Sequence, residues 1–199
     1  ADVQAEQLLQ IDSADFTDAQ LLLLARRVVA MCVRDDVDGV VITRYAHGYD
    51  GDDALRRIRV VEAGHPVPDQ SGERAAREIF SLAGSLQEED LLLVLVSGGG
   101  SSLLSLPAEG ISMADLKTVT RELLACGAPI QEMNVVRKHL SLIQGGRLAA
   151  ATRAKVVSLI ISDVAGDDPS AIASGPTVAD PSTYQDALDI LNAYRITPP

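Results

Sequence analysis

Three glycines between serines follow an apolar run near the middle of the chain, in the segment LVSGGGSSLL at 95–104. Glycine adopts backbone angles closed to other residues, and without a side chain its amide N–H can approach an anion closely. A helix beginning at Ser101 would add its dipole to that attraction. The motif matches neither GxxxxGKS/T nor GxGxxG, so a tight turn that closes a strand onto a helix is an equally weighted alternative. The candidate phosphate-binding residues are Ser97, Gly98, Gly99, Gly100, Ser101 and Ser102.

Carboxylates follow a second apolar run, in ISDVAGDDPSAIASGPT at 161–177. Asp163 ends the run, and Asp167 and Asp168 lie in the next loop, where carboxylates could hold Mg²⁺ through waters and substrate phosphates. Asp168 precedes a proline, which favours a turn or a helix start for that residue. The SGPT turn adds further small and polar residues, among them Ser174 and Gly175.

The densest basic cluster of the chain lies in NVVRKHLSLIQGGRL at 134–148. Arg137, Lys138 and His139 offer counter-charge for a phosphate or a carboxylate, and on a helix Asn134 and Lys138 share one face. A solvated helix face is the alternative, and the residues alone favour it.

The elements that must position these residues alternate between strands and helices. Such alternation with short connections predicts an α/β domain with a mostly parallel sheet, in which ligands bind beyond the carboxyl ends of the strands. The apolar runs at 91–96 and 155–162 are typical of strands buried on both faces. The predicted strands are 38–45, 57–64, 91–96 and 155–162, and the predicted helices are 17–33, 71–86, 112–127, 130–143, one from about 146, and one from Ser182.

Composition excludes several classes of function. The chain has 199 residues, of which 47% are hydrophobic, and a formal net charge of −11 with a pI near 4.6, so a nucleic-acid partner is not expected. No run is apolar and long enough to cross a bilayer, and no signal peptide is evident. Cys32 and Cys126 form no CxxC pair and suggest reduced core thiols, which indicates a cytoplasmic protein.

Four long motifs in register resemble the N-terminal domain of the glycerate 2-kinases, a family that also carries the names hydroxypyruvate reductase and MOFRL protein. They are EAGHPVPDQSG at 62–72, LVSGGGSSLL at 95–104, NVVRKHLSLIQGGRLA at 134–149 and ISDVAGDDPSAIASGPTVADPST at 161–183. The resemblance runs from about Asp38 to the C-terminus. It implies one three-layer, Rossmann-like domain over 1–199, with 1–37 helical and unassigned.

The resemblance implies ATP-dependent phosphorylation of D-glycerate to 2-phosphoglycerate with Mg²⁺, and it leaves open whether the protein is a homo-oligomer. Residues 97–102 become the expected ATP phosphate cradle, and which aspartate is the base and which the metal ligand stays open. The implied catalytic residues are Asp163, Asp167, Lys138 and Arg137; the implied metal ligands are Asp163, Asp167 and Asp168; and the implied substrate-binding residues are Asn134, His139, Ser174 and Gly175.

Because the sequence departs from the family pattern in places, two other functions remain as alternatives. The GAGK turn expected before Asp38 and the C-terminal MOFRL domain have no counterpart in these residues, and Gln144 stands where lysine commonly precedes the paired glycines. One alternative is an NAD(P)H-dependent hydroxypyruvate reductase, which the missing GxGxxG disfavours. The other is a non-catalytic chain that binds a phosphorylated metabolite, which the retained carboxylates disfavour.

Overall fold

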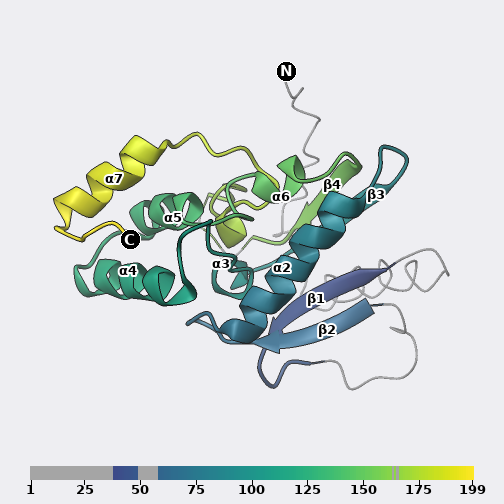
Figure 1. The fold of residues 1–199 in the computed structure, drawn as a ribbon, viewed down its shortest axis with the longest axis horizontal. Coiled ribbons are helices and arrows are strands. Elements are labelled where there is room, and N and C mark those ends of the chain that lie inside the picture. The colour runs from purple at the N-terminus through teal and green to yellow at the C-terminus, as the bar shows by residue number, and fades with distance from the viewer. Residues whose placement is uncertain (1–37, 49–57, 163, 165) are drawn as a thin grey trace.

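A computed structural model of the chain describes residues 38–48, 58–162, 164 and 166–199 (Figure 1). The helix predicted at 17–33, together with Cys32, lies outside the described residues, as does Asp163. No helix in the described ranges is long and apolar enough to cross a membrane.

The four described strands pair in parallel, as predicted. β1 (Gly39–Arg44) pairs with β2 (Ile58–Ala63), and β3 (Leu91–Val96) pairs with β4 (Lys155–Ile160). Within the described ranges they form two separate two-stranded sheets instead of one continuous sheet. The α/β class and the parallel pairing are therefore confirmed.

Helix α2 (Gln70–Ser85) joins the two strand pairs (Figure 1). Asp69 caps it by accepting a hydrogen bond from the amide of Gly72 at 2.9 Å. Its buried Ala76 and Ala83 share one apolar cluster with strand residues from both sheets, Ile42, Leu92 and Val94. A single helix thus organises the strand half of the molecule.

The prediction that β3 and β4 are buried on both faces is wrong for the described structure, because exposed residues alternate with half-buried ones along both strands. Leu92 and Val94 face the cluster around α2, whereas Leu91, Leu93 and Leu95 on the other face are 57%, 36% and 50% exposed. Side chains alternate between the two faces of a strand, and no described element covers this second face.

Three helices form the second half of the molecule: α4 (Met113–Ala125), α5 (Ile130–His139) and α7 (Tyr184–Ala193). They share a buried cluster that includes Leu123, Val136 and Leu191. A capping box of Ser112 and Asp115 begins α4, within the range 112–127 predicted for this helix. Cys126, at the end of that helix, is exposed, so the prediction of a core thiol is wrong for this residue.

Helix α5 ends at His139, four residues before its predicted end. The Ser141 hydroxyl accepts hydrogen bonds from the amides of Ile143 and Gln144, both at 3.2 Å, and Ser141 forms a β-bridge with Pro107. These contacts turn the chain away from the helix.

The helices α6 (Arg147–Ala150) and α7 begin with different kinds of N-cap residue. The one-turn helix α6 starts after Gly146, whose φ is 80°. α7 is capped by Thr183 with Asp186 instead of by Ser182.

Candidate active site

The glycine-rich turn lies at the carboxyl end of β3, as predicted. After Val96 the chain passes through Ser97 and Gly98, both exposed, and Gly99, with φ of 83°, leads into α3 (Gly100–Leu103). Because α3 is a single turn, its dipole adds little to the attraction of an anion.

Two of the turn's glycines are closely packed against their neighbours. A Cβ atom at Gly100 would lie 2.5 Å from the Cβ of Ala173, and one at Gly99 would lie 3.0 Å from Nε2 of His65. Close packing therefore gives a physical reason for glycine at these two positions.

Three motifs far apart in the sequence meet behind this turn. In the 3₁₀ turn η3 (Ile172–Ser174), Ala173, Ser174 and the next residue, Gly175, all have positive φ, at 52°, 57° and 57°. The carbonyls of Ser174 and Gly175 accept hydrogen bonds from the amides of Gly145 and Gly146 at 3.0 and 2.7 Å. The Ser174 hydroxyl donates to that of Ser101 at 3.0 Å.

The buried amide of Gln144 completes this junction. Its Nε2 donates to the carbonyls of Ser101 and Leu104, at 2.9 and 3.1 Å, while the residue is only 2% exposed. The amide satisfies two carbonyls at the end of α3, where a helix leaves its last carbonyls without internal partners. The structure thus gives Gln144 a neutral, structural role at a position where the family resemblance leads us to expect lysine.

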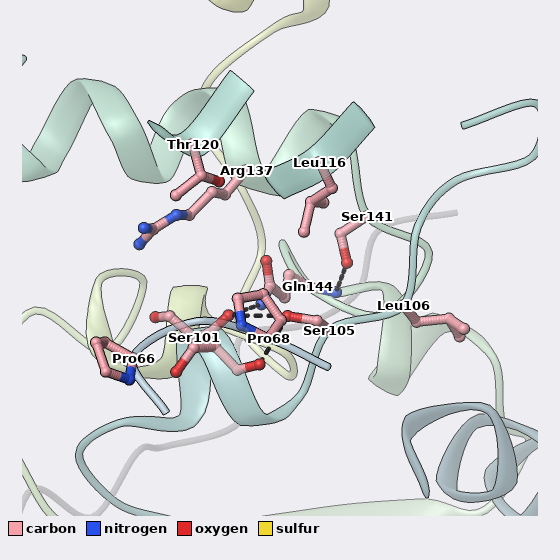
Figure 2. Close-up of a pocket in the computed structure, with 11 residues that line it drawn as sticks. Pro66, Pro68, Ser101, Ser105, Leu106, Leu116, Thr120, Arg137, Ser141 and Gln144 are labelled. Atoms are coloured by element: carbon pink, nitrogen blue, oxygen red, sulfur yellow. Dashed lines mark hydrogen bonds between the residues drawn. The ribbon is translucent and has the colours of Figure 1, made fainter. Parts of the chain in front are cut away.

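A pocket opens between α3 and the helices α4 and α5 (Figure 2). Arg137 extends over Ser101 and Pro66 in this view. No hydrogen bond or ion pair joins the guanidinium of Arg137 to another described residue, and burial lowers the pKa of this group from its ordinary value. The described residues of the lining include no acidic side chain; they are Pro66, Pro68, Ser101, Ser102, Ser105, Leu106, Leu116, Thr120, Arg137, Ser141 and Gln144.

Lys138 is turned away from this pocket. Its Nζ lies 3.4 Å from Oδ1 of Asp180, and the two side chains are 6% and 9% exposed. Burial acts to raise the pKa of Asp180, but hydrogen bonds from Ser182 and the charges of Lys138 and His139 outweigh it and hold that pKa below 3.8. This ion pair ties α5 to the segment that precedes α7.

The other two predicted residues of α5 are also buried. Nδ1 of His139 lies 2.9 Å from the carbonyl oxygen of Val135, and the ring packs edge-on against Tyr184 at 4.7 Å between centroids. Asn134 is 7% exposed, and its Oδ1 has no hydrogen-bond partner. Of the basic cluster, Arg137 is the residue that lines the pocket.

The described carboxylates of the 161–177 segment do not assemble into a metal site. Both carboxylate oxygens of the exposed Asp168 accept hydrogen bonds from Ser170, from its amide and its hydroxyl, each at 2.9 Å. This is the local turn proposed as the alternative for that residue. Asp167 has φ of 51°, and no three metal-ligating side chains come together in the described part of the chain.

Several pocket residues were missed by sequence reasoning. Pro66 and Pro68 belong to the motif after β2, which carried the family resemblance but received no site assignment. Thr120 lies in the middle of α4, where nothing in the local sequence separates it from other helix-surface residues. A signal did exist for the prolines, because loops at the carboxyl ends of parallel strands build ligand sites.

We expect Gly100→Ala to lower the free energy of unfolding by about 1–3 kcal/mol, since the new methyl group overlaps Ala173. The measurement is urea unfolding. Gly84→Ala is the matched control, because its Cβ would lie 3.6 Å from the carbonyl oxygen of Ala151, and alanine in α2 should stabilise by up to about 1 kcal/mol. Equal stability of the two variants would contradict the packing argument.

Comparison with known proteins agrees with the motifs. The model of the domain of unknown function DUF4147 matches residues 19–199. A glycerate 2-kinase from Pyrococcus horikoshii is 49% identical over 164 residues, which cover 82% of this chain and 36% of that protein. A protein from Agrobacterium vitis that carries the name hydroxypyruvate reductase is 54% identical over 165 residues, 82% of this chain and 42% of that protein.

A solved structure supports the same relationship. The crystal structure of glycerate kinase from Thermotoga maritima matches with a TM-score of 0.76 and 47% identity, over 81% of this chain and 39% of that one. The chain thus spans about two fifths of the length of these relatives. From the four motifs, the domain match and the structural match together, the chain belongs to the DUF4147 family, in the group that includes the glycerate kinases.

Proposed function

We propose that this chain is the N-terminal part of an ATP-dependent glycerate 2-kinase, which transfers a phosphoryl group to the 2-hydroxyl of D-glycerate. The observation that carries the proposal is the meeting of three family motifs at one pocket, whose described lining contains an arginine without a side-chain partner and no acidic side chain. We further propose that the two strand pairs belong to one three-layer, Rossmann-like sheet in the whole protein.

Phosphoryl transfer asks a protein mainly for positioning and for neutralisation of charge. In this proposal Arg137 holds an anionic group, and the exposed turn at Ser97 and Gly98 faces the ATP phosphates. Asp163 and Asp167 accept or orient the proton of the attacking hydroxyl. Lys138 and His139 do not contact the substrate in this proposal. They fix the position of α5, and α5 in turn places Arg137 at the pocket.

The described residues fit an anion better than they fit a metal. A divalent cation would neutralise phosphate oxygens in such a reaction. The carboxylates proposed to hold it are Asp163, Asp167 and Asp168, and each oxygen of Asp168 already accepts one hydrogen bond from Ser170. Since no group of three ligands forms within the described ranges, no step is assigned to Mg²⁺.

The test is ³¹P NMR of D-glycerate with ATP and Mg²⁺, run on the product of the complete reading frame and, in parallel, on this 199-residue chain. A glycerate-dependent 2-phosphoglycerate signal from the complete protein supports the proposal. Its absence, together with NADH oxidation by hydroxypyruvate, would favour the reductase named among the relatives. Absence of both activities would favour a binding protein.

A further inference from the structure

Several hydrogen-bond donors in the pocket beside α3 have no acceptor among the described residues. The hydroxyl of Ser101 accepts a hydrogen bond from Ser174, and that of Ser141 accepts two from backbone amides, so each retains its own proton to donate. Within the described structure, no hydrogen bond engages the hydroxyl of Thr120. Together with Arg137 these groups present donors and one positive charge to the same space (Figure 2).

Among the residues that the structure describes, no carboxylate lines this space, although the protein carries a net charge of −11. A half-buried guanidinium without an anion is costly, because burial disfavours a charge that nothing compensates. The same cost of burying the charged form lowers the pKa of Arg137. An external anion would remove this cost and would also accept from the three hydroxyls.

We propose that Arg137, with Ser101, Thr120 and Ser141, binds the carboxylate of the small hydroxy-acid substrate. This assignment rests on the proposed kinase function and deepens it. In it Ser101 binds the acceptor substrate, whereas the family resemblance implied that Ser101 binds the ATP phosphates.

The pocket matches a carboxylate better than it matches a polyphosphate. Its described lining offers one guanidinium, whose two parallel N–H groups suit the two oxygens of a carboxylate. The neighbouring cation, Lys138, is already paired with Asp180, so it is not free to neutralise further phosphate charge. The remaining wall is partly apolar, from Pro66, Pro68, Leu106 and Leu116.

The experiment compares the complete wild-type protein with Arg137→Gln. It measures dissociation constants for D-glycerate, glycerol and inorganic phosphate by ligand-observed NMR, and KM values for D-glycerate and ATP. We expect the variant to weaken D-glycerate binding and raise its KM by about 10- to 100-fold, the loss of a charged hydrogen-bonded pair, with the KM for ATP unchanged. Wild type should not bind glycerol, which lacks the carboxylate.

Two further variants provide a control and a second, independent test of the carboxylate site. Arg153→Gln removes an exposed arginine that precedes β4, at the opposite end of the strand from the pocket, and should leave all constants unchanged. Thr120→Val removes one donor without changing the shape of the side chain and should weaken D-glycerate binding by about 3- to 10-fold, which keeps the proposal testable if Arg137→Gln does not fold.

The outcomes separate this inference from the proposed function. A raised KM for ATP, or weaker phosphate binding, with unchanged D-glycerate binding would overturn the carboxylate site and leave the kinase intact. Binding of D-glycerate that depends on Arg137 without phosphoryl transfer would support the site and overturn the kinase. Equal D-glycerate binding by wild type, Arg137→Gln and Thr120→Val would overturn the carboxylate site outright.

Discussion

Asp180→Asn is expected to lower the free energy of unfolding by about 3–5 kcal/mol, because it leaves the buried Lys138 ammonium without its counter-charge. The asparagine keeps the shape of the side chain and can still accept from Ser182, so the loss reports mainly on charge. Denaturant unfolding at neutral pH measures it.

The double variant Lys138→Met with Asp180→Asn is the control for this prediction. Removal of both charges avoids the unpaired buried cation, and such replacements are often neutral or stabilising. The double variant should therefore recover most of the stability that the single variant loses. A double variant as unstable as Asp180→Asn would show that the carboxylate acts through Ser182 instead of through Lys138.

The same ion pair predicts a dependence on pH. Because the pKa of Asp180 is lower in the folded state than its ordinary value of 3.8, the carboxylate contributes stability above that value. The contribution is lost as the pH falls from about 4 through the folded-state pKa. The acid loss of stability in wild type should therefore be steeper than in Asp180→Asn, where this group no longer titrates.

The elements of the fold were accessible from local sequence signals. Each described strand lies within a run of β-branched or apolar residues that is flanked by polar residues. The capping box at Ser112 marks the start of α4. The end of α5 was not accessible, because it depends on Ser141 and its bridge to Pro107, a contact between distant segments. Exposure of one face of β3 likewise depends on what packs there, which the strand itself does not encode.

The sequence motifs predicted which segments form the candidate site, but they did not predict which residue of each segment faces the pocket. Ser101, Gln144 and Ser174 do meet, as the shared family motifs implied. Which of the adjacent Arg137 and Lys138 faces the pocket depends on the rotation of α5, since neighbours on a helix point about 100° apart. That rotation is fixed in part by Asp180, which lies 42 residues further along the chain and had no predicted role.

Gln144→Glu is expected to destabilise the protein by roughly 2–6 kcal/mol, at about 1–3 kcal/mol for each buried carbonyl that loses its donor. Glutamine donates to the carbonyls of Ser101 and Leu104, whereas an ionised glutamate can only accept, so oxygen would face oxygen at a position that is 2% exposed. The carboxylate would also lie near the pocket of Arg137. D-glycerate binding by the folded fraction should therefore weaken as well.

Gln144→Lys is the matched comparison, since an ammonium donates hydrogen bonds and can serve the same two carbonyls. Its unfolding free energy should lie closer to that of wild type than to that of Gln144→Glu. Both are measured by thermal and urea unfolding at pH 7. If lysine and glutamate prove equally harmful, the cost of an uncompensated buried charge, and not the loss of donors, governs this position.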